Sequence, residues 1–127
     1  MLTTGVDIVQ INRIEKILDT KRDRFYERIF TKKEIKYIEK RQNVKTIAGL
    51  FAAKEAISKA LGTGIGKIGW QDIEITHSER GKPLVHMLSK LKEELVKQNL
   101  NSIEISISHE KEYAIAFAIC FNNSHFK

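Results

Sequence analysis

The segment from Thr46 to Gly66 constrains the fold most strongly, because it is mainly apolar and its spacing is helical. Within its helical core, Ile47 to Leu61, the polar side chains share one arc of about 140° at 100° per residue. The remaining circumference is suited to burial. The sequence therefore predicts a central helix with a single charged stripe that faces an opening, formed by Lys54, Glu55, Ser58 and Lys59.

The charged stripe has two interpretations. Glu55 precedes Lys59 by four residues, which is the favourable order for a helical ion pair of about 0.3–0.5 kcal/mol. The alternative is a binding site, because Gly62, Thr63 and Gly64 follow the helix. Gly62 predicts the end of the helix, since glycine readily adopts the left-handed conformation. The three residues together offer bare backbone beside a hydroxyl, which phosphate oxygens can approach closely.

A second carboxylate favours the binding site. Asp7 interrupts a predicted β-strand, Leu2 to Ile11, that is rich in β-branched residues. A carboxylate in a buried strand is unfavourable unless it is paired or bound to a cation. The segment alone is equally compatible with Asp7 on the solvent face of an edge strand.

The other elements follow from caps and periodicity. Asn12, with Glu15, forms a possible capping box for a helix over 13–30 that breaks near Thr20, and Thr31, with Glu34, forms another for a helix ending at Arg41. Alternation and turn residues predict strands over 70–76 and 84–86, a helix over 87–99, and a hairpin of strands over 102–109 and 113–121. The order predicts a single domain over 1–127 of the α+β class, with a largely antiparallel β-sheet packed against the long central helix.

The charge distribution indicates an acidic partner. The chain carries a net charge of +6, which suits a nucleic acid, an acidic protein or a polyphosphate ligand. Basic residues alternate with apolar ones over 13–30, which either forms a docking surface for an acidic helix or is a solvated helical face. Lys40 and Arg41 either complement the dipole at a helix end or bind phosphate.

The remaining composition points to a cytoplasmic protein. The sequence has no apolar run long enough to span a membrane and no signal peptide at its start. The single Cys120 excludes an internal disulfide and, with scattered histidines, a zinc cluster.

Three motifs together resemble the holo-acyl-carrier-protein synthases, the small phosphopantetheinyl transferases of bacteria. They are Gly5-Val6-Asp7-Ile8, the run 51–56 (FAAKEA) with 59–64 (KALGTG), and 106–109 (SISH) followed by Tyr113-Ala114. Length, motif order and spacing agree over nearly the whole chain. The resemblance implies a phosphopantetheinyl transferase fold and a role in fatty acid biosynthesis.

The resemblance also implies a reaction and an assembly. The 4′-phosphopantetheine group of coenzyme A is moved to a serine of apo-acyl carrier protein, which releases adenosine 3′,5′-bisphosphate. Mg²⁺ is held by Asp7 and Glu55, as suits a cation that takes few protein oxygens and shares substrate phosphates. Lys59 reaches the same phosphates, and Glu55, through a metal-bound water or directly, is the hypothesised base. The family implies a homotrimer with active sites between subunits.

Further residues follow from the same resemblance. Lys40, Arg41, Gly62, Thr63 and Gly64 would contact the nucleotide phosphates, and Lys82, Pro83 and His109 would border the coenzyme. Arg13, Arg24 and Arg28 would meet the acidic carrier protein. One departure is Leu50, since relatives often have an arginine before this phenylalanine. A nucleotide contact is therefore either missing here or supplied by another residue.

Two other functions compete with this one. A metal-dependent nuclease would also use Asp, Glu and Lys and suit a basic chain, but such sites usually place Glu-x-Lys on a strand. A small RNA-binding domain would need exposed aromatic residues on its strands, whereas these strands carry mainly Ile, Val and Ala. We therefore expect no nucleic-acid and no membrane partner.

Overall fold

The computed structural model describes residues 1–126 of the chain, except for the side chains of His125 and Phe126. The elements, in order, are β1 (Leu2–Gln10), α1 (Ile11–Ile29), α2 (Lys32–Arg41), α3 (Val44–Ala60), the 3₁₀ turn η1 (Trp70–Asp72), β2 (Ile73–His77), β3 (Pro83–Met87), α4 (Ser89–Lys97), β4 (Ser102–His109), β5 (Tyr113–Phe121) and the 3₁₀ turn η2 (Asn123–Phe126). The predicted order of strands and helices and the α+β class are confirmed.

The strands form two antiparallel sheets. The larger has three strands in the order β1-β5-β4, so that the two ends of the chain pair along its length, with Asp7 opposite Ala116. The smaller sheet is the hairpin of β2 and β3. Side chains alternate along β1, so Gly5, Asp7 and Val9 lie on the face toward α3, whereas Val6 and Ile8 are exposed on the other face. Asp7 is therefore not on the solvent face, although its strand lies at an edge of the sheet.

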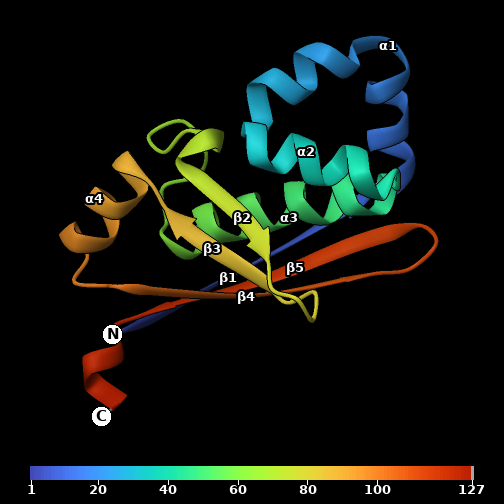
Figure 1. The fold of residues 1–127 in the computed structure, drawn as a ribbon. Helices are drawn as coiled ribbons and strands as arrows, with labels where there is room; N and C mark the ends of the chain where they lie inside the picture. The colour runs from blue at the N-terminus through green and yellow to red at the C-terminus, as the bar shows by residue number, and fades with distance from the viewer. Residues whose placement is uncertain (127) are drawn as a thin grey trace.

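Helix α3 is the centre of the fold, as its sequence predicted. It lies between the three-stranded sheet and helices α1 and α2 (Figure 1). Its residues are buried along most of its length, including Ala48, Ala52, Ala53 and Ala56 at 0% exposure. Small residues allow a close approach here: a Cβ on Gly5 of β1 would lie 2.1 Å from the carbonyl oxygen of Ala56. The backbone of β1 therefore rests directly on α3.

Local signals located three features of the helices correctly. Helix α1 has its predicted break at Lys21, where φ is −139° and ψ is 33°. Thr31 and Glu34 form the predicted capping box of α2. Gly62 has φ of +73° just beyond α3, as expected for a glycine that ends a helix.

Several boundaries differ from the sequence prediction. Residues 70–72 form the 3₁₀ turn η1, so β2 begins at Ile73, and α3 begins at Val44 rather than at Ile47. Two further differences come from distant contacts. Asn12 does not cap α1, because the helix begins at Ile11 and its N-cap, Gln10, makes no side-chain hydrogen bond. The N–H of Ile11 instead donates to the carbonyl of Glu112, 2.9 Å away. Helix α4 begins at Ser89 rather than at Met87, because Met87 pairs with Ile73 in the hairpin. In both places a contact distant in sequence replaces the local signal.

The face of the three-stranded sheet that points away from α3 is apolar and exposed. Val6 and Ile8 of β1 lie opposite Phe117 and Ile115 of β5, and each of these four is at least 41% exposed. We call this surface the open sheet face; it also includes Leu2 and Tyr113. A contiguous apolar surface of this kind usually marks an interface.

Candidate active site

Asp7, Glu55 and Lys59 lie together where β1 crosses the last two turns of α3. Contact between Gly5 and Ala56 fixes this crossing, which places the three side chains on neighbouring backbone. The ammonium of Lys59 donates to Asp7 Oδ1 at 2.9 Å and to the carbonyl of Val6 at 3.1 Å. The Asp7 side chain is 16% exposed and that of Lys59 is 52% exposed, so the group opens to solvent.

The carboxylate of Glu55 is in an unfavourable environment for its charge. Partial burial raises the pKa of Glu55, the nearby charge of Asp7 raises it further, and Lys59 lowers it. Two like charges beside each other disfavour ionisation of both. A cation placed between them would relieve this repulsion.

The donor set fits Mg²⁺. Among the residues that the structure describes, no group of three or more His, Cys, Asp and Glu side chains could hold a metal by itself. Mg²⁺ is commonly bound by one or two carboxylates, with waters and substrate phosphates completing its shell. Asp7 and Glu55 supply two carboxylates from two rigid elements, so they could hold such an ion.

The prediction of a single charged stripe on α3 is wrong in one respect. Lys54 and Ser58 are fully buried, whereas Glu55 and Lys59 reach the surface. Lys54 donates to Glu34 Oε1 at 2.6 Å and to the carbonyls of Ile29 and Trp70. The alternative interpretation of the stripe, a helical ion pair between Glu55 and Lys59, is not observed, because the ion-pair partner of Lys59 in the described structure is Asp7.

The segment 62–64 follows this group directly but offers fewer free donors than expected. The N–H of Gly62 donates to the carbonyl of Lys59, and those of Thr63 and Gly64 donate to the carbonyl of Ser58. The hydroxyl of Thr63 donates to the carbonyl of Gly64 at 2.9 Å. These bonds complete the C-terminus of α3, whose dipole disfavours an anion. The glycines therefore permit close approach, while the positive charge that an anion needs comes from Lys59.

A second group of predicted residues lines a pocket of about 160 Å³ near the start of α3. Arg41, Pro83 and His109 are among its lining, whereas Lys40 and Lys82 are not. Lys40 is exposed on α2, and Lys82 pairs with Glu104 at 3.2 Å on the surface. The α3 residues that line this pocket, from Lys45 to Leu50, lie about 8 to 15 Å along the helix from Glu55, since each residue adds about 1.5 Å.

Two side chains of this pocket were not expected from the sequence. Tyr37 and His77 stack with ring centroids 4.0 Å apart, and Arg41 lies over the Tyr37 ring. Burial lowers the pKa of His77, as does the charge of Arg41. No local pattern indicates this stack, because the two residues come from α2 and β2. Leu50, the residue that departs from the family, is 1% exposed and also lines the pocket. The lining contains a second basic residue besides Arg41, which is Lys45.

The basic residues of α1 border a third hollow of about 370 Å³. Arg24 and Arg28 stand at its rim with Lys21, and Phe25, Phe51 and Trp70 form its apolar lining. We call this hollow the aromatic pocket. Arg13 is exposed on the first half of α1, four residues before Ile17 of the pocket lining. The basic helix is therefore continuous with an apolar recess, as docking of an acidic helix requires.

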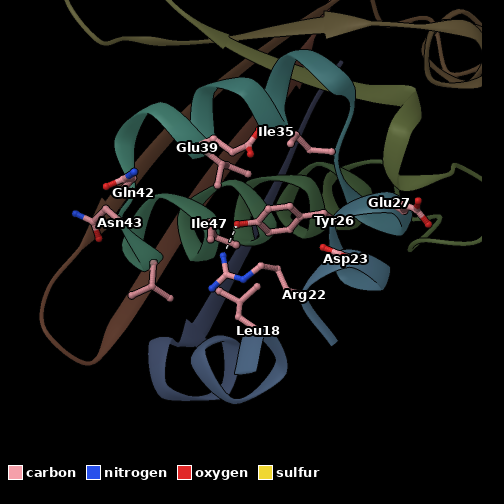
Figure 2. Close-up of a pocket in the computed structure, with 12 residues that line it drawn as sticks. Leu18, Arg22, Asp23, Tyr26, Glu27, Ile35, Glu39, Gln42, Asn43 and Ile47 are labelled. Atoms are coloured by element: carbon pink, nitrogen blue, oxygen red, sulfur yellow. Dashed lines mark hydrogen bonds between the residues drawn. The ribbon is translucent and has the colours of Figure 1, made fainter. Parts of the chain in front are cut away.

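A larger hollow, about 740 Å³, lies elsewhere, between the second half of α1 and α2. Figure 2 shows Arg22 bonded to the hydroxyl of Tyr26, with Asp23, Glu27 and Glu39 around them. Three carboxylates and one arginine do not suit a polyphosphate. None of the predicted site residues lines this hollow.

The chain is similar to known proteins over most of its length. A family model described as the 4′-phosphopantetheinyl transferase superfamily matches residues 3–118, which sets the class of protein. A holo-[acyl-carrier-protein] synthase of Thermoanaerobacter sp. (strain X514) is 50% identical over 119 residues, covering 93% of this chain and 86% of the relative.

Solved structures agree with this classification. The Helicobacter pylori holo-[acyl-carrier-protein] synthase in complex with coenzyme A superimposes with a TM-score of 0.83 at 39% identity, covering 92% of this chain and 98% of that one. The Bacillus anthracis synthase in complex with CoA (3′,5′-ADP) gives a TM-score of 0.79 at 39% identity, covering 94% and 96%. The chain belongs to the holo-[acyl-carrier-protein] synthase family of phosphopantetheinyl transferases, and it is an enzyme of that kind.

Proposed function

We propose that this chain transfers 4′-phosphopantetheine from coenzyme A to a serine of apo-acyl carrier protein in a Mg²⁺-dependent reaction. The observation that carries the proposal is the meeting of Asp7 and Glu55 beside Lys59, from segments about 50 residues apart. The serine oxygen forms a bond to the phosphorus next to pantetheine. The bond from that phosphorus to the nucleotide phosphate breaks, and adenosine 3′,5′-bisphosphate leaves.

The three side chains of this group have distinct roles. Asp7 and Glu55 would hold Mg²⁺, which when bound supplies positive charge to the diphosphate. Lys59 supplies a further charge on flexible methylenes, and its partial exposure leaves it free to turn from Asp7 toward a phosphate. Glu55, whose pKa is raised, accepts the serine proton directly or through a water.

The coenzyme would extend from this group to the pocket of Arg41, Pro83 and His109. Complexes of the Helicobacter and Bacillus relatives with coenzyme A support a coenzyme site of this kind. Lys40 on α2 and Lys82 in the turn before β3 are each next in sequence to a residue of the pocket lining, and they would contact the ligand from its rim. Gly62, Thr63 and Gly64 would border the phosphates near Lys59.

The carrier protein would dock on α1. Arg13, Arg24 and Arg28 are exposed cations on this helix, and the aromatic pocket beside them would take an apolar side chain of an acidic helix. Charge complementarity of this kind mainly accelerates association and selects partners.

The open sheet face supports a homotrimer with active sites between subunits. Its exposed apolar residues come from β1, which also carries Asp7, and from β5. A subunit packed here would lie against the strand that positions the metal ligand. We further propose that residues 1–127 act as one domain in the cytoplasm, within fatty acid biosynthesis. No helix in the described part of the chain has the length and apolar character to span a membrane.

The nucleic-acid alternatives have less support. The strands do expose aromatic residues, Tyr113 and Phe117, contrary to the expectation from their composition. However, β1, β4 and β5 contain no lysine or arginine to contact phosphates. Glu55 and Lys59 lie on helix α3, not on a strand as in the nuclease pattern.

The direct test incubates the protein with apo-acyl carrier protein, coenzyme A and Mg²⁺ and follows the carrier by mass spectrometry. We expect one added phosphopantetheine arm, and none with EDTA or with a carrier whose acceptor serine is alanine. Transfer that persists in EDTA would contradict the metal role. Absence of any arm, together with salt-dependent binding of nucleic acid that coenzyme A does not affect, would favour the alternatives.

A further inference from the structure

The aromatic pocket has two walls that belong to different parts of the chain. One wall is the end of α1, with Phe25 and Ile29, and the other is Trp70 of η1. Phe51 of α3 lies between them, with its ring centroid 5.9 Å from that of Phe25 and 5.0 Å from that of Trp70. The gap between α1 and η1 therefore determines the width of the pocket.

Two side chains join these walls through backbone carbonyls. The amide of Gln71, the residue after Trp70, donates to the carbonyl of Glu27 at 2.6 Å and to that of Phe30 at 2.9 Å. From the buried side, the ammonium of Lys54 donates to the carbonyl of Ile29 at 2.8 Å and to that of Trp70 at 3.0 Å. The last carbonyls of a helix have no partner within the helix. Here they bind donors from η1 and α3 instead of water.

The buried half of this connection is itself rigid. Glu34 accepts from Lys54 and also from the backbone N–H groups of Thr31 and Ile75. Lys54 and Glu34 are both 0% exposed. Gln71, by contrast, is exposed, so its hydrogen bonds are the part that a substitution can remove without burying an unpaired charge.

We propose that Gln71 is a positioning residue for the carrier protein, and that with Lys54 it sets the gap between α1 and Trp70 on which docking depends. The inference rests on the proposed docking of the carrier on α1. Gln71 need not contact the carrier. Its two hydrogen bonds keep the basic and aromatic residues of α1 at a fixed distance from Trp70, so the pocket is formed before the carrier binds.

The test uses Gln71→Met, which keeps an unbranched, neutral side chain but has no donor, and Gln71→Ala. Asn122→Ala is the matched control, since the Asn122 amide donates to a backbone carbonyl, that of Asn99, far from the pocket. Trp70 is the only tryptophan, so acrylamide quenching of its fluorescence reports the pocket directly. Binding of fluorescently labelled apo-carrier protein gives Kd without turnover, and initial rates give separate KM values for the carrier and for coenzyme A.

We expect both Gln71 variants to raise Kd and KM for the carrier about three- to tenfold, as for loss of one or two hydrogen bonds. KM for coenzyme A should stay within about twofold, and quenching of Trp70 should increase. A loss of general stability would not produce this split. Unchanged Trp70 quenching, or an unchanged Kd for the carrier, would overturn the inference. If the wild-type protein binds the carrier but adds no phosphopantetheine arm, the proposed function is contradicted. The role of Gln71 is still decided in that case by comparing Kd for the carrier between the wild type and the Gln71 variants.

Discussion

Glu55 is the residue on which the proposed chemistry depends most, because its carboxylate is held beside that of Asp7. A site built this way is more favourable with a bound cation than without one. The pKa of Glu55 is raised above the usual 4.5, mainly by burial and also by the charge of Asp7. In the metal-free protein, the contribution of Glu55 to stability therefore falls as pH rises through the range just above 4.5, where the folded carboxyl binds more protons than the unfolded one.

Glu55→Gln should slow transfer by at least about 100-fold, because it removes a metal ligand and the hypothesised base. In EDTA at neutral pH the variant should unfold at the same temperature as the wild type or higher, since a neutral amide avoids the repulsion from Asp7. Thermal unfolding with and without Mg²⁺, at pH 4.5 and pH 7, measures both effects. Near-normal turnover, or Mg²⁺ stabilisation equal to that of the wild type, would contradict the ligand role.

Lys59→Ala tests whether the ammonium of Lys59 binds a phosphate of coenzyme A in addition to its ion pair with Asp7. Loss of a charged hydrogen bond to coenzyme A should weaken its binding and slow transfer by roughly 10- to 100-fold. Stability should fall by no more than about 1 kcal/mol, because the ion pair with Asp7 is partly exposed. The checks are transfer kinetics and urea unfolding. An unchanged rate would leave Lys59 as a partner of Asp7 only.

At the scale of elements, the site exists because β1 and α3 touch. Gly5 has no side chain at the point where the strand crosses the helix, and the backbone of Ala56 and Ala60 occupies the space that a Cβ would need. Asp7 lies on the same face, two residues further along β1. The distance between the two carboxylates therefore depends on the packing of a strand against a helix.

Gly5→Ala should separate β1 from α3, because the new Cβ would meet backbone atoms at 2.1 and 2.6 Å. We expect a loss of about 3 kcal/mol in the free energy of unfolding, at the upper end of the usual cost of overpacking, and weaker Mg²⁺ binding. Gly69→Ala is the matched control, since a Cβ there meets only the end of the Asp72 side chain, at 3.1 Å. Urea denaturation of the two variants gives the comparison. Equal stability would mean that β1 is not fixed by this contact.

Helix α1 presents its basic residues on both sides of the break at Lys21. Charge reversal at Arg13 and Arg24 should raise KM for the carrier protein at least about tenfold, because it replaces attraction by repulsion. KM for coenzyme A should change little, since neither residue lines the pocket of Arg41. Steady-state kinetics at low and high salt measure the split. Equal changes in both KM values would show that α1 is not the docking helix.

At the scale of the whole molecule, the open sheet face makes the protomer unusual. One side of the sheet packs against α3, and the other exposes large apolar residues over β1 and β5. Antiparallel sheets commonly have one polar face in water. The exposed apolar face and the proposed active site between subunits are therefore both explained by a homotrimer whose subunits pack on this face.

Phe117→Glu should convert the assembled protein to monomers and reduce transfer, because it places a charge in the centre of the open sheet face. Phe117 is 41% exposed and pairs with Val6 across the sheet. Val96→Glu on α4 is the control, since Val96 is an exposed apolar residue outside this face. Sedimentation velocity gives the mass of each variant. A wild type that is monomeric and fully active would contradict the proposed trimer.

Local interactions explain what the sequence determined by itself. The helices, strands and their order follow from periodicity, and the capping box of Thr31 and the stop at Gly62 involve atoms within a few residues of each other. The apolar circumference of α3 was enough to place it at the centre. The capping box and the stop depend on sterics and hydrogen bonds that act within a few residues, so they need no information about distant contacts.

Only the tertiary structure decided which polar residues of α3 serve the site. Lys54 and Glu55 are neighbours, yet one is buried against Glu34, 20 residues away, while the other reaches the surface. Lys59 pairs with Asp7, 52 residues away, instead of with Glu55. The physical reason is that burial and ion pairing depend on what packs against each side of the helix, and helical spacing carries no information about which elements those are.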